Sequence, residues 1–299
     1  MKNGRPDQLY PLLAAMDHPI ARDQHSYEEL FCQGHFREQG GRQRWQTAGA
    51  SRLDELRRLT RPLVLHRRKQ QVLDLPPKQR MFEGIDLDAE ELKGFDYRLR
   101  LVIDDYRQRV AQGLVRSDAE SLAVLTALRQ IAAEFKLPAA QQLIQRLREQ
   151  HKPIVLFSSF VDPLLLLHER LGGVLLTGRQ KPEQRQFAVD RFQAGETDLL
   201  LATFAAGGLG FTLHRAQHVV LLERPWTPGD IDQAEDRCHR IGMEGGLISH
   251  WLQLGLADQL VDGLVASKAE RIELLLGPRR VALDRQPLPK LVSRCLQDL

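Results

Sequence analysis

Three side chains in the second half of the sequence have the types and spacing of an anion-binding site. Gln233, Arg237 and Arg240 follow one another at i, i+4 and i+7 in a stretch that reads as a helix over residues 231–241. At about 100° per residue they form a stripe roughly 60° wide. Two guanidinium groups one turn apart beside an amide suit the oxygens of a polyphosphate. A solvated face with an ordinary Asp236–Arg240 ion pair fits the same geometry equally well.

The helix that would carry this stripe has its own apolar face and a start signal. Ile231, Ala234, Cys238 and Ile241 fall within roughly 80° of one another, which indicates a face buried in a core. Asp230 follows a Thr-Pro-Gly turn and is expected to be the N-cap. We therefore expect this helix to pack on a domain with the cationic stripe on a separate side.

A glycine-rich turn lies before the helix, between apolar runs at residues 198–202 and 217–223 that have the length of buried strands. The turn reads Ala-Ala-Gly-Gly-Leu-Gly and ends at Gly210. Because glycine lacks Cβ and reaches positive φ, such a turn can present backbone N–H groups to a phosphate. A dinucleotide-binding fingerprint is set aside, because the third glycine, three residues further on, is missing.

Residues 233–242, which read QAEDRCHRIG, resemble helicase motif VI of the SNF2 family of DNA-translocating ATPases. The glycine-rich turn before them is similar to motif V of that family. In such motors the two motif VI arginines are arginine fingers that act on ATP held by the other RecA-like lobe. The resemblance implies ATP and Mg²⁺ as cofactors, bound mainly by the first lobe. It implies catalytic roles for Arg237 and Arg240, and nucleotide contacts by Gly208, Gly210 and Gln233.

Further segments resemble parts of the family that contact the phosphates of double-stranded DNA. Residues 154–160 are similar to helicase motif IV, and residues 177–185 to a G-x-[ST]-x-x-x-[QE]-R segment at a helix N-terminus. Arg185 could equally pair with Glu183 or Asp190 nearby. The candidate DNA-binding residues are Ser158, Ser159, Arg179, Lys181, Arg185 and Thr203.

The glycine-rich segment departs from the family pattern at two positions. Ala205 stands where the family usually has a basic residue, so a DNA contact there is not expected. Thr212 replaces an asparagine, as it also does in the annealing-helicase branch. Trp226 and Trp251 are expected in the core rather than stacked on bases.

From residue 138 onward, apolar strand patterns and helical patterns alternate with short loops, which favours a parallel sheet with helices on both faces. Ligands of such sheets bind beyond the carboxyl ends of the strands, where the candidates above fall. With the resemblance, the expected fold is α/β and RecA-like, of the P-loop NTPase type. Strands are expected at residues 154–157, 174–176, 198–202, 217–223 and 247–252, and helices at 138–150, 162–171, 182–192 and 257–276.

The first half of the chain resembles what surrounds that lobe in SNF2 proteins. Residues 3–13 are similar to the segment after motif III, so the chain is expected to begin at the far end of lobe one. Residues 61–78, a cationic run ending in Pro-Pro-Lys, resemble the interlobe linker of the annealing-helicase branch. A solvated linker fits this run, as does a DNA-backbone or interlobe contact by Arg67, Arg68 and Lys69. Helical patterns at 88–112 and 117–135, after a strand at 81–87, match the helical insertion of the family and are expected to pack rather than do chemistry.

The expected organisation has four parts: the tail of lobe one and the linker over residues 1–80, a strand and helical insertion over 81–135, the second RecA-like lobe over 136–276, and a basic tail over 277–299. A 42% hydrophobic content is ample for a packed core. The three cysteines, Cys32, Cys238 and Cys295, form no C-x-x-C pair, so neither a zinc site nor a disulfide framework is indicated. Apolar runs fall far short of the about 18 residues of a membrane span, and no signal peptide is recognised. A cytoplasmic location follows, nucleoid-associated if the source is bacterial.

The 299 residues contain neither a G-x-x-x-x-G-K-[ST] phosphate loop nor a D-E-x-H run. The resemblance therefore predicts the second lobe of a double-stranded DNA translocase, inactive as an ATPase until a first lobe is supplied. An RNA or DNA helicase lobe of superfamily 2 is the nearest enzymatic alternative, and the linker and helical insertion argue against it. A non-catalytic DNA-binding or interaction module that keeps the fold is the alternative from another class.

Overall fold

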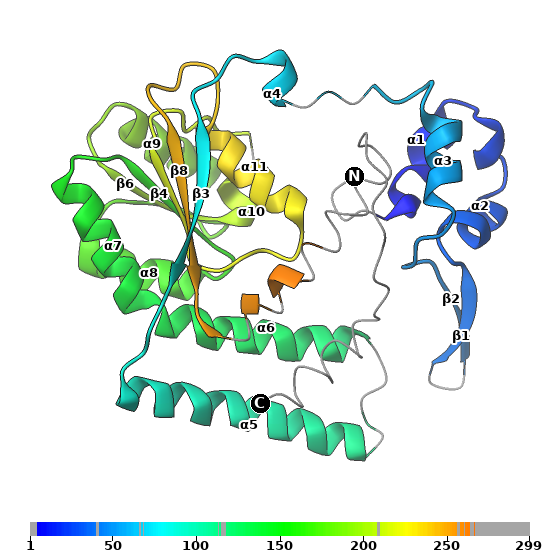
Figure 1. The fold of residues 1–299 in the computed structure, drawn as a ribbon, viewed down its shortest axis with the longest axis horizontal. Helices are drawn as coiled ribbons and strands as arrows, with labels where there is room; N and C mark the ends of the chain where they lie inside the picture. The colour runs from blue at the N-terminus through cyan, green and yellow to red at the C-terminus, as the bar shows by residue number, and fades with distance from the viewer. Residues whose placement is uncertain are drawn as a thin grey trace.

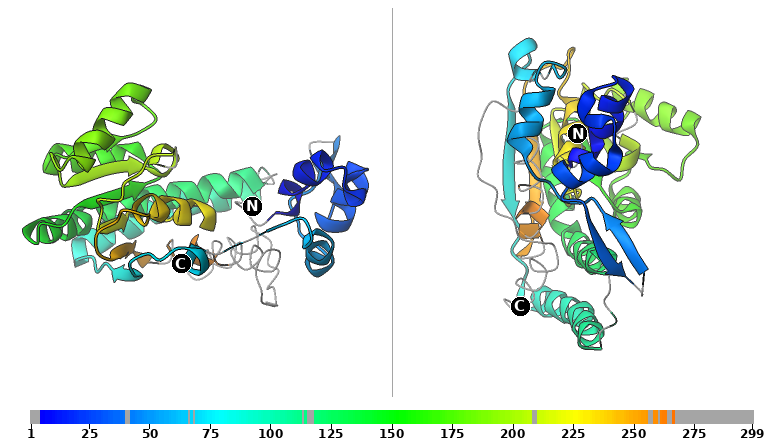
Figure 2. Two further views of the ribbon diagram at one scale, coloured as in Figure 1. Left: turned by 90° about the horizontal axis from the view of Figure 1, so that it is seen from above. Right: turned by 90° about the vertical axis from the view of Figure 1, so that its right-hand side faces the viewer.

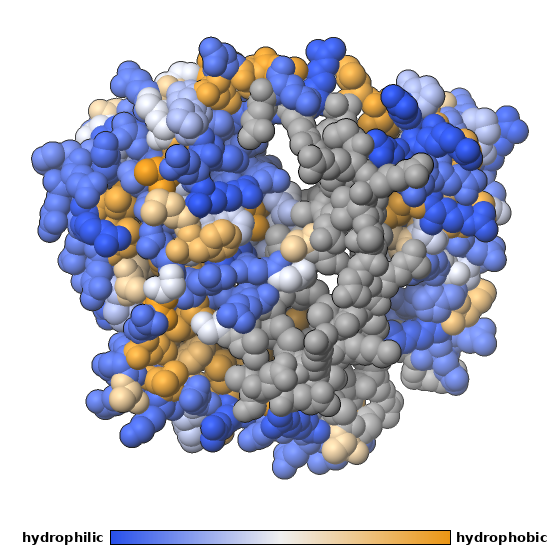
Figure 3. All heavy atoms as spheres, in the orientation of Figure 1, coloured by the Kyte–Doolittle hydropathy of each residue, from blue (hydrophilic) through white to orange (hydrophobic). Residues whose placement is uncertain are grey.

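The computed structural model describes residues 5–39, 42–65, 67, 69–112, 114, 118–207, 210–255, 258–259, 261–263 and 266. A small N-terminal body and a larger α/β body lie side by side in Figures 1 and 2 and are joined by residues 61–77, which we call the linker. The surface seen in Figure 3 is largely hydrophilic with separate apolar patches, in keeping with a chain of 27% charged residues.

The N-terminal body is built from short helices and one hairpin around a small core of its own. Leu13, Tyr27 and Leu56 are almost completely buried there, and the Tyr27 hydroxyl donates to the Pro6 carbonyl at 2.8 Å. The hairpin is absent from the sequence-based expectations because its strands are polar and mostly exposed, so they show no apolar alternation. The elements are η1 (Pro6–Gln8), α1 (Tyr10–Ala15), η2 (Pro19–Ala21), α2 (Gln24–Phe31), β1 (His35–Gln39), β2 (Arg42–Gln46) and α3 (Leu53–Thr60).

The larger body is organised around a six-stranded sheet in the order β3-β8-β7-β4-β6-β5, with every described pair of neighbours parallel. Five strands coincide with the expected apolar runs within about two residues. The edge strand begins at Lys78, three residues before the expected start at 81, so it takes in the end of the cationic run. The strands are β3 (Lys78–Gly84), β4 (Ile154–Ser158), β5 (Val174–Leu176), β6 (Leu199–Thr203), β7 (His218–Leu221) and β8 (Leu247–Gln253).

Helices cover both faces of this sheet, which confirms the expected α/β class. Alternate residues of β4 enter opposite cores: Val155 and Phe157 pack with α9, α10 and α11, while Ile154 and Leu156 pack with α7 and α8. All four of these side chains are fully buried, as a central parallel strand requires. The helices are α7 (Leu137–Glu149), α8 (Val161–Leu171), α9 (Pro182–Gln193), α10 (Phe204–Gly207) and α11 (Pro228–Cys238).

A pair of long helices, α5 (Ala89–Ala111) and α6 (Asp118–Phe135), comes between β3 and β4 in the sequence and lies below the sheet in Figure 1. Phe95, Leu99 and Leu128 belong to the buried cluster between them, together with Leu254 from the end of β8. This packing role is the expected one. A short helix, α4 (Lys69–Val72), lies in the linker.

Within the described residues, no helix is long and apolar enough to cross a membrane, and no group of three or more His, Cys, Asp and Glu side chains could hold a metal ion. The expected closing helix over 257–276 lies largely, and the tail over 277–299 wholly, outside the described residues.

Candidate functional site

Helix α11 begins at Pro228, three residues before its expected first residue, Ile231. Thr227 has extended backbone angles, and its hydroxyl accepts a hydrogen bond from the Asp230 amide at 3.3 Å. Pro228 follows at the first helical position, where its missing N–H costs nothing. The prediction of Asp230 as N-cap is therefore wrong: Asp230 lies inside the first turn, where its charge suits the helix dipole.

The helix also ends earlier than expected, at Cys238. His239 leaves helical geometry with ψ of 82°, and Arg240 and Ile241 follow in a turn that closes at Gly242 with φ of +93°. The prediction that Ile241 belongs to the core face is wrong, because its side chain is 73% exposed. Ile231, Ala234 and Cys238 do form that buried face.

Although Arg240 lies beyond the helix, the three residues of the predicted stripe line one open pocket of about 720 Å³, which we call the arginine pocket. This volume is in the range of ligand pockets. Arg240 Nη1 donates to the Thr212 hydroxyl at 3.0 Å, so the glycine-rich segment holds this guanidinium in place. The full lining is Lys69, Leu73, Thr212, Gln233, Asp236, Arg237, Arg240 and Ile241.

Positive charge is in excess in the arginine pocket. Partial burial, together with the neighbouring charge of Arg240, lowers the pKa of the Arg237 guanidinium, and Asp236 only partly opposes this. Arginine remains protonated at neutral pH despite such a shift. Asp236 pairs with Lys69 at 3.1 Å and Lys78 at 3.8 Å rather than forming the ordinary i,i+4 pair with Arg240. The pocket is therefore suited to an anion.

The glycines near this pocket differ in what they require. Gly210 has φ of +89° with open space where a Cβ would point, so its backbone, rather than packing, demands glycine. Gly207 ends α10, and a Cβ there would lie 2.6 Å from the Phe157 ring, which makes it a packing glycine. Gly208, the other predicted nucleotide contact, lies outside the described residues.

Two of the predicted DNA-binding hydroxyls point inward. Ser158 is fully buried, and its hydroxyl donates to the Glu223 carboxylate at 3.2 Å. Thr203 is buried at the start of α10, where its hydroxyl accepts from the Ala206 amide at 3.3 Å. Ser159 is exposed: its backbone N–H donates to Glu223, while its hydroxyl accepts from another side chain. Of these three residues, the structure leaves Ser159 facing solvent.

The three predicted basic residues gather at the start of α9, beyond the carboxyl end of β5. Arg179 and Lys181 are exposed, and Arg179 Nη2 lies 3.5 Å from Asp162. The Lys181 amide donates to the Gln184 side chain at 3.0 Å, and Pro182 takes the expected first helical position. Arg185 is half-buried in a second pocket of about 610 Å³, lined also by Pro182, Glu183, Gln186, Phe187, Asp190 and Phe211.

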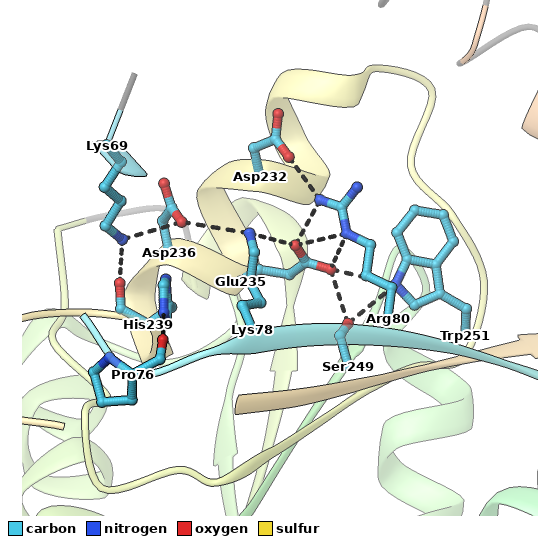
Figure 4. A network of polar contacts seen from close by, with 10 residues as sticks. All are labelled: Lys69, Pro76, Lys78, Arg80, Asp232, Glu235, Asp236, His239, Ser249 and Trp251. Atoms are coloured by element: carbon cyan, nitrogen blue, oxygen red, sulfur yellow. Dashed lines mark hydrogen bonds and ion pairs between the residues drawn. The ribbon is translucent and has the colours of Figure 1, made fainter. Parts of the chain in front are cut away.

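A buried carboxylate on α11 was not singled out from the sequence. Glu235 is fully buried and binds Lys78 at 3.0 Å, Arg80 at 2.6 Å and the Ser249 hydroxyl at 2.8 Å (Figure 4). Burial alone would raise the pKa of Glu235, but the bonds and charges of Arg80 and Lys78 outweigh it and lower the pKa. The available signal was Lys78 and Arg80 themselves, whose spacing of two residues places them on one face of a strand.

A second buried network, which the sequence analysis did not predict, connects the helical insertion to the sheet. Arg129 on α6 is 3% exposed and donates to the Ser159 hydroxyl at 2.9 Å, with its guanidinium 4.5 Å from the centre of the Trp226 ring. Lys136 is fully buried, 2.6 Å from Asp258. Burial lowers the pKa values of Arg129 and Lys136, and carboxylates facing them oppose this effect.

The known proteins that resemble this chain are helicases and related ATPases. Residues 136–242 match the family model described as the helicase conserved C-terminal domain. The chain is 28% identical over 292 residues to the DNA annealing helicase and endonuclease ZRANB3 of Homo sapiens, covering 95% of this chain and 27% of that protein. It is 28% identical over 244 residues to the putative ATP-dependent helicase/translocase YwqA of Bacillus subtilis, covering 73% and 26%. The chain thus spans little more than a quarter of the length of these relatives.

Solved structures show the same fold. The C-terminal part of the Fun30 ATPase domain superposes with a TM-score of 0.55 at 16% identity, covering 75% of this chain and 98% of that one. The Sulfolobus solfataricus SWI2/SNF2 ATPase core in complex with dsDNA gives a TM-score of 0.51 at 23% identity, covering 71% and 49%.

Proposed function

Since the chain contains the C-terminal RecA-like lobe of an SNF2-type helicase of superfamily 2, we propose that it is half of an ATP-dependent motor that moves along double-stranded DNA. The observation that carries this proposal is the arginine pocket, where Arg237, Arg240 and Gln233 converge on an open space with excess positive charge. In a motor with two lobes, one lobe binds the nucleotide and its metal, and the other lobe contributes positively charged side chains that face the phosphates. An open pocket with excess positive charge is what that second half of the site requires.

In this proposal, Arg237 and Arg240 stabilise the charge that spreads over the γ-phosphoryl oxygens during transfer. The Arg240 guanidinium is held before reaction by the Thr212 hydroxyl, and Arg237 lines the same pocket. Donors fixed in advance stabilise a transition state without reorganisation. Gln233 and the backbone at Gly210 are the proposed contacts to the rest of the nucleotide. ATP and Mg²⁺, bound mainly by the first lobe, supply the phosphoryl group and neutralise its charge.

The proposed DNA contacts lie beyond the carboxyl ends of β4 and β5. Ser159, Arg179 and Lys181 are exposed there. Arg185, four residues after Lys181, is half-buried. Such groups bind phosphates and carry no sequence information by themselves. Ser158 and Thr203 support this surface from within, by holding Glu223 and the start of α10. Duplex DNA as the ligand is supported by the solved SWI2/SNF2 core, whose complex contains dsDNA.

The test is reconstitution. With a first lobe supplied, either as the preceding part of one polypeptide or as a separate chain, ATP hydrolysis stimulated by duplex DNA should appear. Stimulation by single-stranded RNA instead of duplex DNA would favour an RNA helicase lobe. DNA binding with no hydrolysis under any arrangement of the two lobes would favour a non-catalytic binding module.

A further inference from the structure

One side of α11 is occupied by the linker and the start of β3. Asp232, Glu235, Asp236 and His239 are spaced i, i+3, i+4 and i+7, which places them along a single side of the helix. This side differs from the buried apolar face and adjoins the side that carries Gln233 and Arg237, and Asp236 at its border also lines the arginine pocket. Figure 4 shows the four residues in contact with Lys69, Pro76, Lys78 and Arg80.

The contacts fall into two groups along the helix. In the middle of α11, Arg80 and Lys78 bind the buried Glu235, and Arg80 also reaches Asp232 at 2.8 Å. At the end of α11, the contacts come from the linker. Lys69 Nζ lies 3.1 Å from Asp236 and donates to the His239 carbonyl, while the His239 ring donates to the Pro76 carbonyl at 2.7 Å.

The second group holds the turn that carries Arg240. The linker binds both the carbonyl and the ring of His239, and Arg240 is the next residue. A lysine beside the last carbonyl groups of a helix also offsets the negative end of the helix dipole. Lys69 lines the arginine pocket as well, but its amino group is already engaged by Asp236 and the His239 carbonyl.

The linker, which makes these contacts, is also the covalent connection between the two bodies of the molecule (Figure 1). The linker therefore offers a direct path from the N-terminal body to the end of α11. We propose that Lys69 is a positioning residue, through which the linker fixes the position of Arg240. The geometry of the arginine pocket then depends on how the two bodies are arranged. This inference rests on the proposed role of Arg237 and Arg240 as the phosphate-binding pair.

The alternative for Lys69 is that it binds the anion directly, and Asp236 separates the two roles. Inorganic tripolyphosphate is the probe, and its affinity for the 299-residue chain is measured by calorimetry at fixed low salt. Asp236→Asn removes a negative charge from the pocket, so simple electrostatics predicts tighter binding. If Lys69 positions Arg240, Asp236→Asn should instead weaken binding, as Lys69→Met does, because each variant releases the same contact.

We expect Lys69→Met and Asp236→Asn each to weaken tripolyphosphate binding about fivefold, the upper end for a half-exposed ion pair. The double variant should be no weaker than either single one. Lys69→Arg should retain most of the affinity. Lys93→Met, at an exposed position on α5, is the matched control and should change nothing. Thermal melting of every variant checks that the fold is kept.

With a first lobe supplied, Lys69→Met should lower kcat for ATP while KM for ATP and the affinity for DNA stay the same. Unchanged or tighter tripolyphosphate binding by Asp236→Asn, with weaker binding by Lys69→Met, would make Lys69 a direct ligand and overturn the inference. No effect of either variant, while Arg240→Ala abolishes binding, would overturn it too and leave the proposed function standing. If Arg240→Ala itself has no effect, the proposed function fails.

Discussion

Arg80 on the edge strand and Glu235 on α11, 155 residues apart in sequence, form an ion pair with Nη2 and Oε2 2.6 Å apart. The Arg80 guanidinium also lies 4.9 Å from the centre of the Trp251 ring, so it is held by both charge and an aromatic face. This pair attaches β3 to the helix behind the arginine pocket. The sheet edge and the candidate site are thereby parts of one network.

The pair should contribute measurably to stability. Arg80→Met should lower the free energy of unfolding by about 2 kcal/mol, less than for a fully buried pair because the Arg80 side chain is 38% exposed. Urea denaturation monitored by circular dichroism gives the value. Arg191→Met is the control, because it breaks the exposed Arg191–Glu196 pair at the end of α9. It should lower the free energy of unfolding by less than about 1 kcal/mol. Equal losses in the two variants would contradict a special role for Glu235.

The strands of the sheet could be predicted well from the sequence, whereas the ends of the elements around the candidate site could not. Strands β4 and β6 are buried on both faces, so their apolar runs are unmistakable. The start of β3 at Lys78 could not be predicted, because that residue looks like linker until Glu235 is placed beside it. The end of α11 likewise depends on Lys69 and Pro76, far away in the chain.

The candidate residues divide in the same way. That Arg237 and Arg240 line one pocket could be predicted because their types and spacing are visible locally, and the resemblance added their expected role. The inward turn of Ser158 depends on Glu223, 65 residues later, and no local pattern reports such a partner. Glu235 lies in a run of charged residues that reads as a solvated face, and its burial follows only from the register of β3 and β8 beneath it.

Stability should fall as the pH drops below neutrality, because of a buried histidine pair. His218 Nδ1 lies 2.9 Å from His250 Nε2, and His250 Nδ1 lies 2.8 Å from Glu83. Burial, together with the charges of His250 and Lys152, lowers the pKa of His218 to about 4. In the unfolded chain the value is about 6.5. Between these values the unfolded chain binds more protons, so the free energy of unfolding decreases as pH falls.

The expected loss is about 2–3 kcal/mol between pH 6.5 and pH 4. Urea denaturation at pH 7.5, 6.5, 5.5, 4.5 and 4.0 measures it. His218→Gln cannot take up a proton at this position, so its stability should change much less over the same range. An identical pH profile in the variant and the original chain would show that another group is responsible.

Binding to duplex DNA should be weak, independent of sequence and sensitive to salt. Each lysine or arginine that contacts a phosphate adds about 0.9 to the slope of log affinity against log salt concentration. Arg179→Gln and Lys181→Gln should each lower the affinity and reduce this slope by about one contact. Fluorescence anisotropy over a salt series measures both, with Arg191→Gln in the last turn of α9 as the control. A flat salt profile, or a strong preference for one sequence, would argue against backbone binding.

The 299-residue chain alone should not hydrolyse ATP, with or without duplex DNA. The residues that bind the nucleotide phosphates and the metal in P-loop motors are not found in its sequence. A phosphate-release assay on highly purified protein measures the activity. Turnover that disappears in Arg237→Ala would falsify the half-site interpretation, whereas turnover that persists in that variant would indicate a contaminating enzyme.

With a first lobe supplied, activity should depend on both arginines. Arginine fingers contribute roughly 10³–10⁵ in rate in P-loop enzymes, so Arg237→Ala and Arg240→Ala should each lower kcat by orders of magnitude. Lysine should restore little at either position, because an ammonium group cannot reproduce the planar fork. Melting temperatures should change little, since both side chains line an open pocket rather than the apolar core. Gln233→Ala, in the same pocket without a charge, should have the smaller effect on kcat. A collapse of stability with turnover intact would mean that these arginines hold the fold together and that the charge in the pocket serves structure rather than phosphoryl transfer.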